Sequence, residues 1–172
     1  MDLRTRDITD LLGRGVNYAL TLWPEWICKF TLFDADVENR KWAPPRELIG
    51  QRIALHSGAH IGGRKGATAM VEGIQAFGGQ AEEAGWAPTG VGPGWIEFEK
   101  LDRTVRLELD KIATRAITCT GLLVDVTSPS RPRPGDGWYV GTYGWRFREI
   151  ERLPTPIACS GAQGLWRIGG LL

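Results

Sequence analysis

The stretch DVENRKW (residues 36–42), followed by the run LIGQRIALH (residues 48–56), decides how the fold of this chain is interpreted. The first part places an acid, an amide, a guanidinium and an indole within seven residues, and the second is an apolar strand that ends in a histidine. One interpretation is a small polar pocket, in which Glu38 and Asn39 read a planar base or an acyl amide while Arg40 binds a phosphate or carboxylate. The other is a turn whose charges are solvated and whose tryptophan covers the core.

Upstream of this stretch the sequence predicts one strand and one helix. Residues 18–22 form the strand, and Pro24 stands where the first turn of a helix tolerates proline. Over residues 24–33 the apolar side chains recur at helical spacing and form one stripe, made of Trp26, Ile27, Phe30 and Phe33. We expect this helix to pack across the side of a sheet and to lead into residues 36–40. Trp26 is either a core residue or a platform on which a base stacks.

Downstream, Pro44-Pro45 forces an extended bend before a strand over residues 52–56. The alternating pattern puts His56 on the face opposite the large aliphatic side chains, so His56 need not be a core residue and could face the same cleft as Glu38. A metal site is not expected. His56 and His60 would suit a metal only on a helix, which the intervening serine and glycine break, and no further ligands follow at sensible spacing.

The middle of the chain, about residues 62–110, is interpreted as an insertion. It begins with a predicted core-facing helix over residues 65–77, which Gly78-Gly79 would stop and to which we assign no chemistry. A glycine- and proline-rich loop over residues 79–94 and a hairpin over residues 96–109 follow. Because loops on a rigid scaffold carry function, we expect this part to set the individual specificity.

A long strand is predicted over residues 116–126, with a bulge or bend at Gly121. The proline-rich segment 128–137 is either a solvated linker or an arm whose Arg131 and Arg133 contact phosphates.

The next strand has an aromatic face and a basic face. Tyr143, Trp145 and Phe147 form the first, and Gly144, Arg146 and Arg148 form the second. Residues 159–168 are expected to close a barrel. Within them, Cys159 is expected to be a small buried thiol, because no sequence cue pairs it with a base.

Several of these motifs, in this order, resemble the ASCH family of the PUA-like superfamily. The matching positions are residues 19–23, Trp26, residues 37–40, Trp42, Gly50, residues 53–56, residues 141–145 and residues 159–166. The resemblance spans roughly residues 17 to 168, apart from the middle of the chain. It implies a PUA-like barrel that binds RNA or another nucleic acid. Some relatives hydrolyse N4-acylated cytidines, and others are reported as ribonucleases.

The chain departs from the family motif Gly-x-Lys-x-x-Glu-x-Arg. Glu38 and Arg40 match, but the glycine position is Phe33 and the lysine position is Ala35. Hydrolysing relatives depend on that lysine, so the resemblance implies binding more strongly than catalysis. The lysines that could replace it without occupying its position are Lys29 and Lys41.

Composition sets further bounds. At 172 residues the chain is long enough for one domain with a real core. A net charge of +1 means that nucleic-acid binding would need a local site rather than bulk attraction. Three cysteines argue against a disulfide scaffold and for a reducing compartment. No apolar run has the length of a membrane span, and the first residues lack the apolar region of a signal peptide, so we expect a cytoplasmic protein.

We therefore expect an α+β fold, a small twisted β-barrel of roughly five to seven strands with flanking helices. Residues 17–172 would form the single domain. Residues 1–16 would be an arm, with one short helix in which Ile8, Leu11 and Leu12 are at helical spacing. The expected function is binding of RNA or of a single-stranded or modified base, without a cofactor and without a membrane. The alternative is a hydrolase of N4-acylated cytidines or a ribonuclease. The expected ligand-binding residues are Trp26, Glu38, Asn39, Arg40, Trp42, Tyr143, Trp145, Arg146 and Arg148, and the catalytic residues of an enzyme would be Glu38 and His56.

Overall fold

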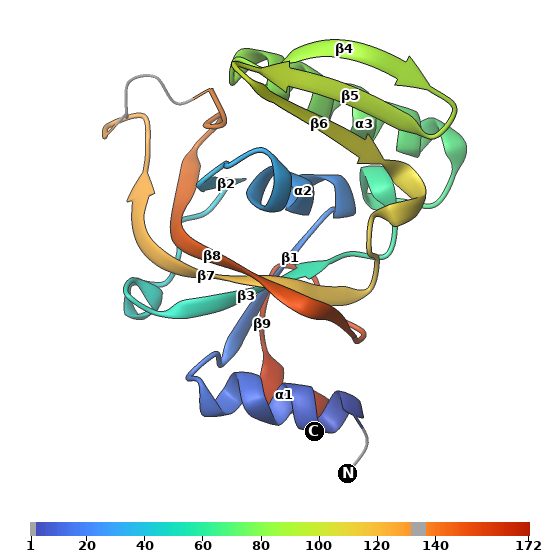
Figure 1. Cartoon of the computed structure of the whole chain (residues 1–172). Helices are drawn as coiled ribbons and strands as arrows, with labels where there is room; N and C mark the ends of the chain where they lie inside the picture. The colour runs from blue at the N-terminus through green and yellow to red at the C-terminus, as the bar shows by residue number, and fades with distance from the viewer. Residues whose placement is uncertain (1–2, 132–136) are drawn as a thin grey trace.

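The computed structural model describes residues 3–131 and 137–172, and their fold is α+β (Figure 1). Six strands form a mixed sheet that curls into a half-barrel. Their order across the sheet is β2 (Val37–Arg40), β8 (Tyr143–Ala158), β7 (Ala116–Thr127), β3 (Arg52–Ser57), β1 (Tyr18–Leu22) and β9 (Leu165–Arg167). In this sheet β1 and β3 run parallel, and the other neighbours are antiparallel.

Helix α2 (Pro24–Leu32) lies between the half-barrel and a second layer, as Figure 1 shows. The predicted helix is confirmed. Its apolar side chains pack both against the half-barrel and against the second layer. Ile27 and Phe30 join the core of the half-barrel, while Cys28 joins a second cluster beneath the other layer. The chain then passes directly into β2, so residues 37–40 emerge beside the helix.

The second layer comes from the middle of the chain, where the predictions were partly wrong. Helix α3 (Ala67–Glu83) does not end at Gly78-Gly79. Burial of side chains in the next turn stabilises the helix by more than the low helix propensity of the two glycines destabilises it. A strand, β4 (Ala87–Gly92), stands where a loop was predicted. The predicted hairpin is confirmed as β5 (Trp95–Lys100) and β6 (Arg103–Glu108), and the sheet order is β4-β5-β6.

Helix α1 (Leu3–Gly13) covers the other side of the half-barrel. Its Ile8 and Leu11 are buried in a third cluster with Ala54 of β3 and Ile168, so the predicted short helix is part of the packed core. Both faces of β3 are therefore buried. Short 3₁₀ turns, η1 (Arg46–Leu48), η2 (Ile61–Gly63), η3 (Leu109–Lys111) and η4 (Ile168–Leu171), complete the secondary structure.

The half-barrel is left open on one side. The register between β7 and β8 shifts between Thr120 and Leu122, which confirms the predicted bulge at Gly121. The expectation that residues 159–168 close the barrel was wrong. Among the described residues β9 pairs with β1 alone and β2 with β8 alone, so each forms an edge of the sheet. None of the described helices is long and apolar enough to span a membrane.

Candidate functional site

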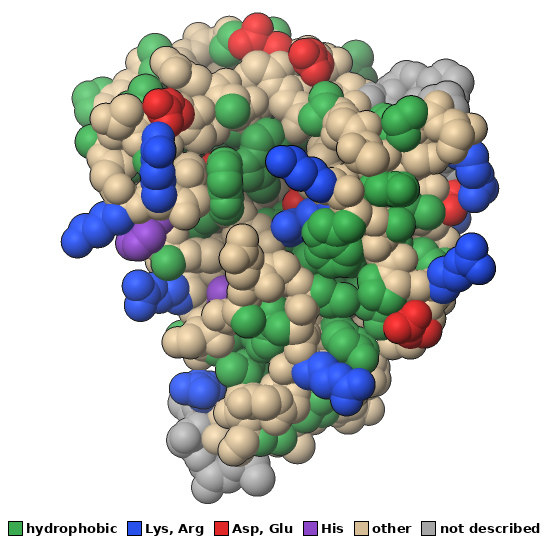
Figure 2. All heavy atoms as spheres, turned by 180° about the vertical axis from the view of Figure 1, so that it is seen from behind, with side chains coloured by type: hydrophobic (Ala, Val, Ile, Leu, Met, Phe, Trp, Pro, Cys, Tyr) green, Lys and Arg blue, Asp and Glu red, His purple; other side chains and the backbone are tan. Residues whose placement is uncertain are grey.

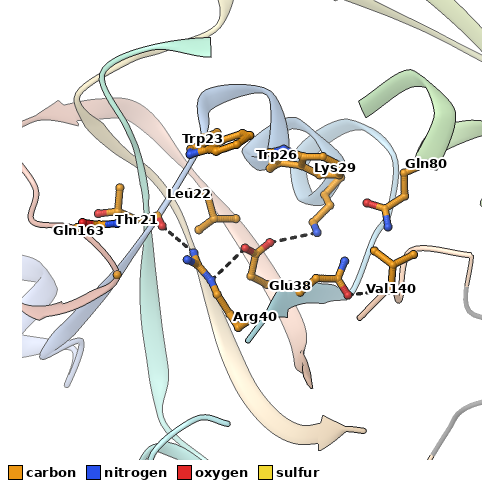
Figure 3. Close-up of a pocket in the computed structure, with 12 residues that line it drawn as sticks. Thr21, Leu22, Trp23, Trp26, Lys29, Glu38, Arg40, Gln80, Val140 and Gln163 are labelled. Atoms are coloured by element: carbon orange, nitrogen blue, oxygen red, sulfur yellow. Dashed lines mark hydrogen bonds and ion pairs between the residues drawn. The ribbon is translucent and has the colours of Figure 1, made fainter. Parts of the chain in front are cut away.

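A pocket of about 380 Å³ lies between β2 and the end of β1, with α2 as its roof (Figure 3). It therefore occupies the open side of the half-barrel. Its lining residues are Thr21, Leu22, Trp23, Trp26, Lys29, Glu38, Asn39, Arg40, Gln80, Val140, Gln163 and Gly164. Four of the expected ligand-binding residues are in this set: Trp26, Glu38, Asn39 and Arg40.

A carboxylate held between two cations forms the floor of the pocket. Lys29 Nζ lies 3.1 Å from Glu38 Oε2, and Arg40 Nε lies 3.2 Å from Glu38 Oε1. The Lys29 and Glu38 side chains are only 1% and 9% exposed, so little water screens this pair. Because a buried ion pair is costly to desolvate, a stable fold by itself gives no reason to place one here.

Lys29 is the residue that sequence reasoning undervalued. Within α2 it is three positions after Trp26, which puts it on the apolar stripe rather than on a solvated face. A lysine inside a helix's apolar stripe is the signal that could have identified it. Burial lowers the pKa of the Lys29 ammonium, and the Glu38 carboxylate opposes that shift. Ala35, which occupies the lysine position of the family motif, packs in the second core cluster and does not line the pocket.

Arg40 joins the two sides of the opening. While its Nε faces Glu38, its Nη2 donates a hydrogen bond of 2.6 Å to the backbone carbonyl of Thr21 at the end of β1. The planar guanidinium can make both contacts at once because its donors form a rigid fork. Arg40 therefore orients the carboxylate and connects the edge strand β2 to β1.

Two tryptophans line the roof of the pocket: Trp26 of α2 and Trp23, the residue before that helix. Trp23 is 49% exposed at the mouth, and its indole lies so close to Gly63 that a Cβ there would collide with the ring. Trp26 lies deeper, edge-on to Phe77 at a centroid distance of 5.6 Å and 5.3 Å from Lys29 Nζ. Trp26 thus packs against the core and also lines the pocket, and its role as a platform for a base stays a prediction.

The amide of Asn39 is engaged by the backbone of the neighbouring segment. Its Nδ2 donates to the Trp138 carbonyl at 2.8 Å, and its Oδ1 accepts from the Val140 amide at 2.8 Å. Gln80 of α3 donates to the same Trp138 carbonyl at 3.2 Å. Helix α3, to which the sequence analysis assigned no chemistry, thus lines the pocket through Gln80.

The remaining expected ligand-binding residues do not line the pocket. Trp42 packs edge-on against Trp145 at 4.7 Å, and Trp145 is buried in the core. Arg146 is 2% exposed and pairs with Asp36 at 2.8 Å, so the predicted basic face is partly an internal ion pair. Tyr143 is half-buried on β8 beside Arg40 of β2, and Arg148 is exposed further along the same strand.

His56 is on the opposite face of the sheet from the floor of the pocket. The predicted alternation along β3 holds, but the face that carries His56 is covered by the segment 159–164 and by Trp166. Its Nδ1 lies 3.1 Å from Thr21 Oγ1 and its Nε2 lies 3.2 Å from the Cys159 carbonyl. Burial lowers the pKa of His56. The idea that His56 faces the same cleft as Glu38 was therefore wrong, because the strand is central and covered on both faces.

The three cysteines are buried and unpaired with one another. Burial raises the pKa of Cys28 to about 12 and that of Cys119 to about 11. Burial also raises the pKa of Cys159, which is 5% exposed, so the prediction of a small buried thiol is confirmed.

The outer surface around the site carries no continuous basic area on the face in Figure 2. That face shows a hollow bordered by hydrophobic side chains, and basic side chains stand apart from one another around it. Of the two arginines expected on the proline-rich segment, Arg131 is exposed and Arg133 lies outside the described residues. Within residues 3–131 and 137–172, no cluster of three or more His, Cys, Asp or Glu side chains could hold a metal ion.

Neither a protein-family model nor a curated protein matches the chain.

Proposed function

We propose that this chain is an ASCH-like module that binds one base of RNA, of single-stranded nucleic acid or of a modified nucleoside. The observation that carries the proposal is the Glu38 carboxylate, held between Lys29 and Arg40 on the floor of a pocket roofed by Trp23 and Trp26. Four of these residues, Trp23, Trp26, Glu38 and Arg40, belong to the motifs that resemble the ASCH family.

The size and chemistry of the pocket support a base rather than a long polymer segment. A volume of about 380 Å³ is within the range of small-molecule sites, roughly 300–1,000 Å³. Indole faces stack on any base, and charged groups at the floor supply both donors and an acceptor for its edge. A net charge of +1 also favours recognition in a pocket over attraction along a backbone.

Trp23 offers the first test. Replacing it by alanine is expected to weaken binding of a nucleoside or a short single-stranded RNA by about 1–3 kcal/mol, because one stacking surface is lost. Trp23 is 49% exposed, so the fold should tolerate the change. Titration calorimetry measures the effect. Trp95→Ala, on the second sheet, is the control and should bind like the wild type. Equal affinities for wild type, Trp23→Ala and Trp95→Ala would contradict a base stacked at the mouth.

Arg40 offers the second test. Arg40→Ala should weaken binding of an uncharged nucleoside by about tenfold, because Glu38 loses one of the two groups that orient it. Arg40→Lys should weaken it similarly, since an ammonium cannot reproduce the forked contact to Glu38 and to Thr21.

The matched control for Arg40 is Arg131→Ala on the exposed segment. It should leave nucleoside binding unchanged and reduce only the salt dependence of oligonucleotide binding. Unchanged nucleoside binding in Arg40→Ala would contradict binding of the nucleoside in this pocket.

A second candidate function, hydrolysis of an N4-acylated cytidine, is favoured by the position of Lys29. The amine that the motif lacks at Ala35 is supplied from α2, 3.1 Å from Glu38. In such a reaction Glu38 would accept a proton from the attacking water, and the Lys29 ammonium would donate one to the leaving amine. Arg40 would stabilise the negative charge that develops on the acyl oxygen.

A further inference from the structure

Gln80 places a buried amide in the wall of the pocket. It belongs to α3, in the part of the chain that the family resemblance does not cover, and it is 7% exposed. Figure 3 shows its side chain turned toward the pocket beside Lys29 and Val140.

The orientation of this amide follows from its neighbour. Gln80 Nε2 lies 3.2 Å from the carbonyl oxygen of Trp138, which also accepts a hydrogen bond of 2.8 Å from Asn39 Nδ2. A carbonyl oxygen can only accept, so the nitrogen of Gln80 must be on that side. Figure 3 shows the other end of the amide, Oε1, on the side of Lys29.

Gln80 Oε1 is a buried acceptor for which no hydrogen-bond donor is found among residues 3–131 and 137–172. Buried polar atoms are nearly always satisfied, and an unsatisfied one costs stability. A donor on the bound ligand would satisfy it. Glu38, on the floor of the same pocket, is a second acceptor, while Lys29 is a donor.

We propose that Gln80 is the specificity-determining residue of the pocket and that it selects bases with an amino group, as in cytosine or adenine. This inference rests on the proposed binding of a base. Gln80 Oε1 accepts a hydrogen bond from the amino N–H, and the Lys29 ammonium donates to the ring nitrogen next to that group. A base with a keto group in that place would set its oxygen against the acceptors Gln80 and Glu38, which is repulsive.

The test compares two nucleosides and one variant by titration calorimetry. Cytidine carries two amino hydrogens and N4,N4-dimethylcytidine carries none, while both stack and keep the ring acceptors. The wild type is expected to bind cytidine more tightly, on the order of tenfold, which is the value of one hydrogen bond. Gln80→Met keeps the side-chain length without the acceptor, so it should weaken cytidine binding to the level of the dimethylated nucleoside and leave the latter unchanged.

The dimethylated nucleoside also reports whether the pocket is intact. If Gln80→Met lost both ligands, or kept the preference for cytidine, Gln80 would not be the selecting residue. Equal binding of both nucleosides by the wild type would overturn the inference while leaving the proposed function in place. Binding of neither nucleoside by the wild type would overturn the proposed function, and the inference with it.

Discussion

Replacing Glu38 by alanine is expected to lower the free energy of unfolding by about 3–5 kcal/mol, the usual cost of removing one partner of a buried ion pair. The cost arises because the Lys29 ammonium, 1% exposed, loses the carboxylate 3.1 Å away while its burial limits solvation by water. Denaturant unfolding of wild type and variant measures the difference. Glu47→Ala, at an exposed position, is the control and should change stability by less than about 0.5 kcal/mol.

The double variant Lys29→Met/Glu38→Ala separates an uncompensated charge from lost packing. Replacing both partners by apolar groups is often close to neutral, so the double variant should recover most of the loss. A double variant as unstable as Glu38→Ala alone would show that the pair contributes through packing and not through its charges.

The pH dependence of the free energy of unfolding of the same variants tests whether the charge of Lys29 causes the loss. Burial lowers the pKa of Lys29 in the folded state from 10.5, so between the folded value and 10.5 the unfolded chain binds more protons. The free energy of unfolding therefore rises with pH in that window. Removing Glu38 lowers the folded pKa further and extends the window downward. The deficit of Glu38→Ala should therefore shrink as the pH rises through this extended part of the window, and Lys29→Met/Glu38→Ala should lack this change.

The second large effect concerns hydrolysis. If the wild type hydrolyses N4-acetylcytidine, Lys29→Met is expected to reduce the rate by about 10²–10⁴-fold, because a general acid is lost. Glu38→Gln should reduce it similarly, because an amide cannot accept the proton of water. Release of acetate is the measurement, and a short RNA in parallel reports backbone cleavage. Lys111→Met, at an exposed lysine near the second sheet, is the control.

The alkaline limb of the pH–rate profile would identify Lys29 as the acid. The ammonium form is the active one, so activity falls as pH rises through its pKa, which burial places below 10.5. Lys29→Arg keeps a positive charge that is not lost over the alkaline range, so the surviving activity should lose that limb. A wild type without turnover would remove the hydrolase candidate, and turnover unaffected in Lys29→Met would remove Lys29 from the mechanism.

The sequence alone was sufficient to predict the elements whose apolar side chains recur with a clear period. The stripe of α2, the strand β3 and the β5–β6 hairpin follow from local backbone geometry, which sets where successive side chains point. The motif around Glu38 and Arg40 was found for a related reason, since its mixture of charges and amides is unusual for a solvated turn. Both residues line the pocket.

Only the tertiary structure decided which faces are covered and which distant side chains meet. His56 is on the face that alternation predicts, but the segment 159–164 and α1 bury that face. Gln80 reaches the pocket because α3 continues past Gly78 and Gly79, stabilised by the packing of its last turn. Lys29 meets Glu38 because α2 lies in the open side of the half-barrel beside β2. Periodicity is a property of the local backbone, whereas burial and pairing depend on parts of the chain that are distant in sequence, so no local pattern encodes them.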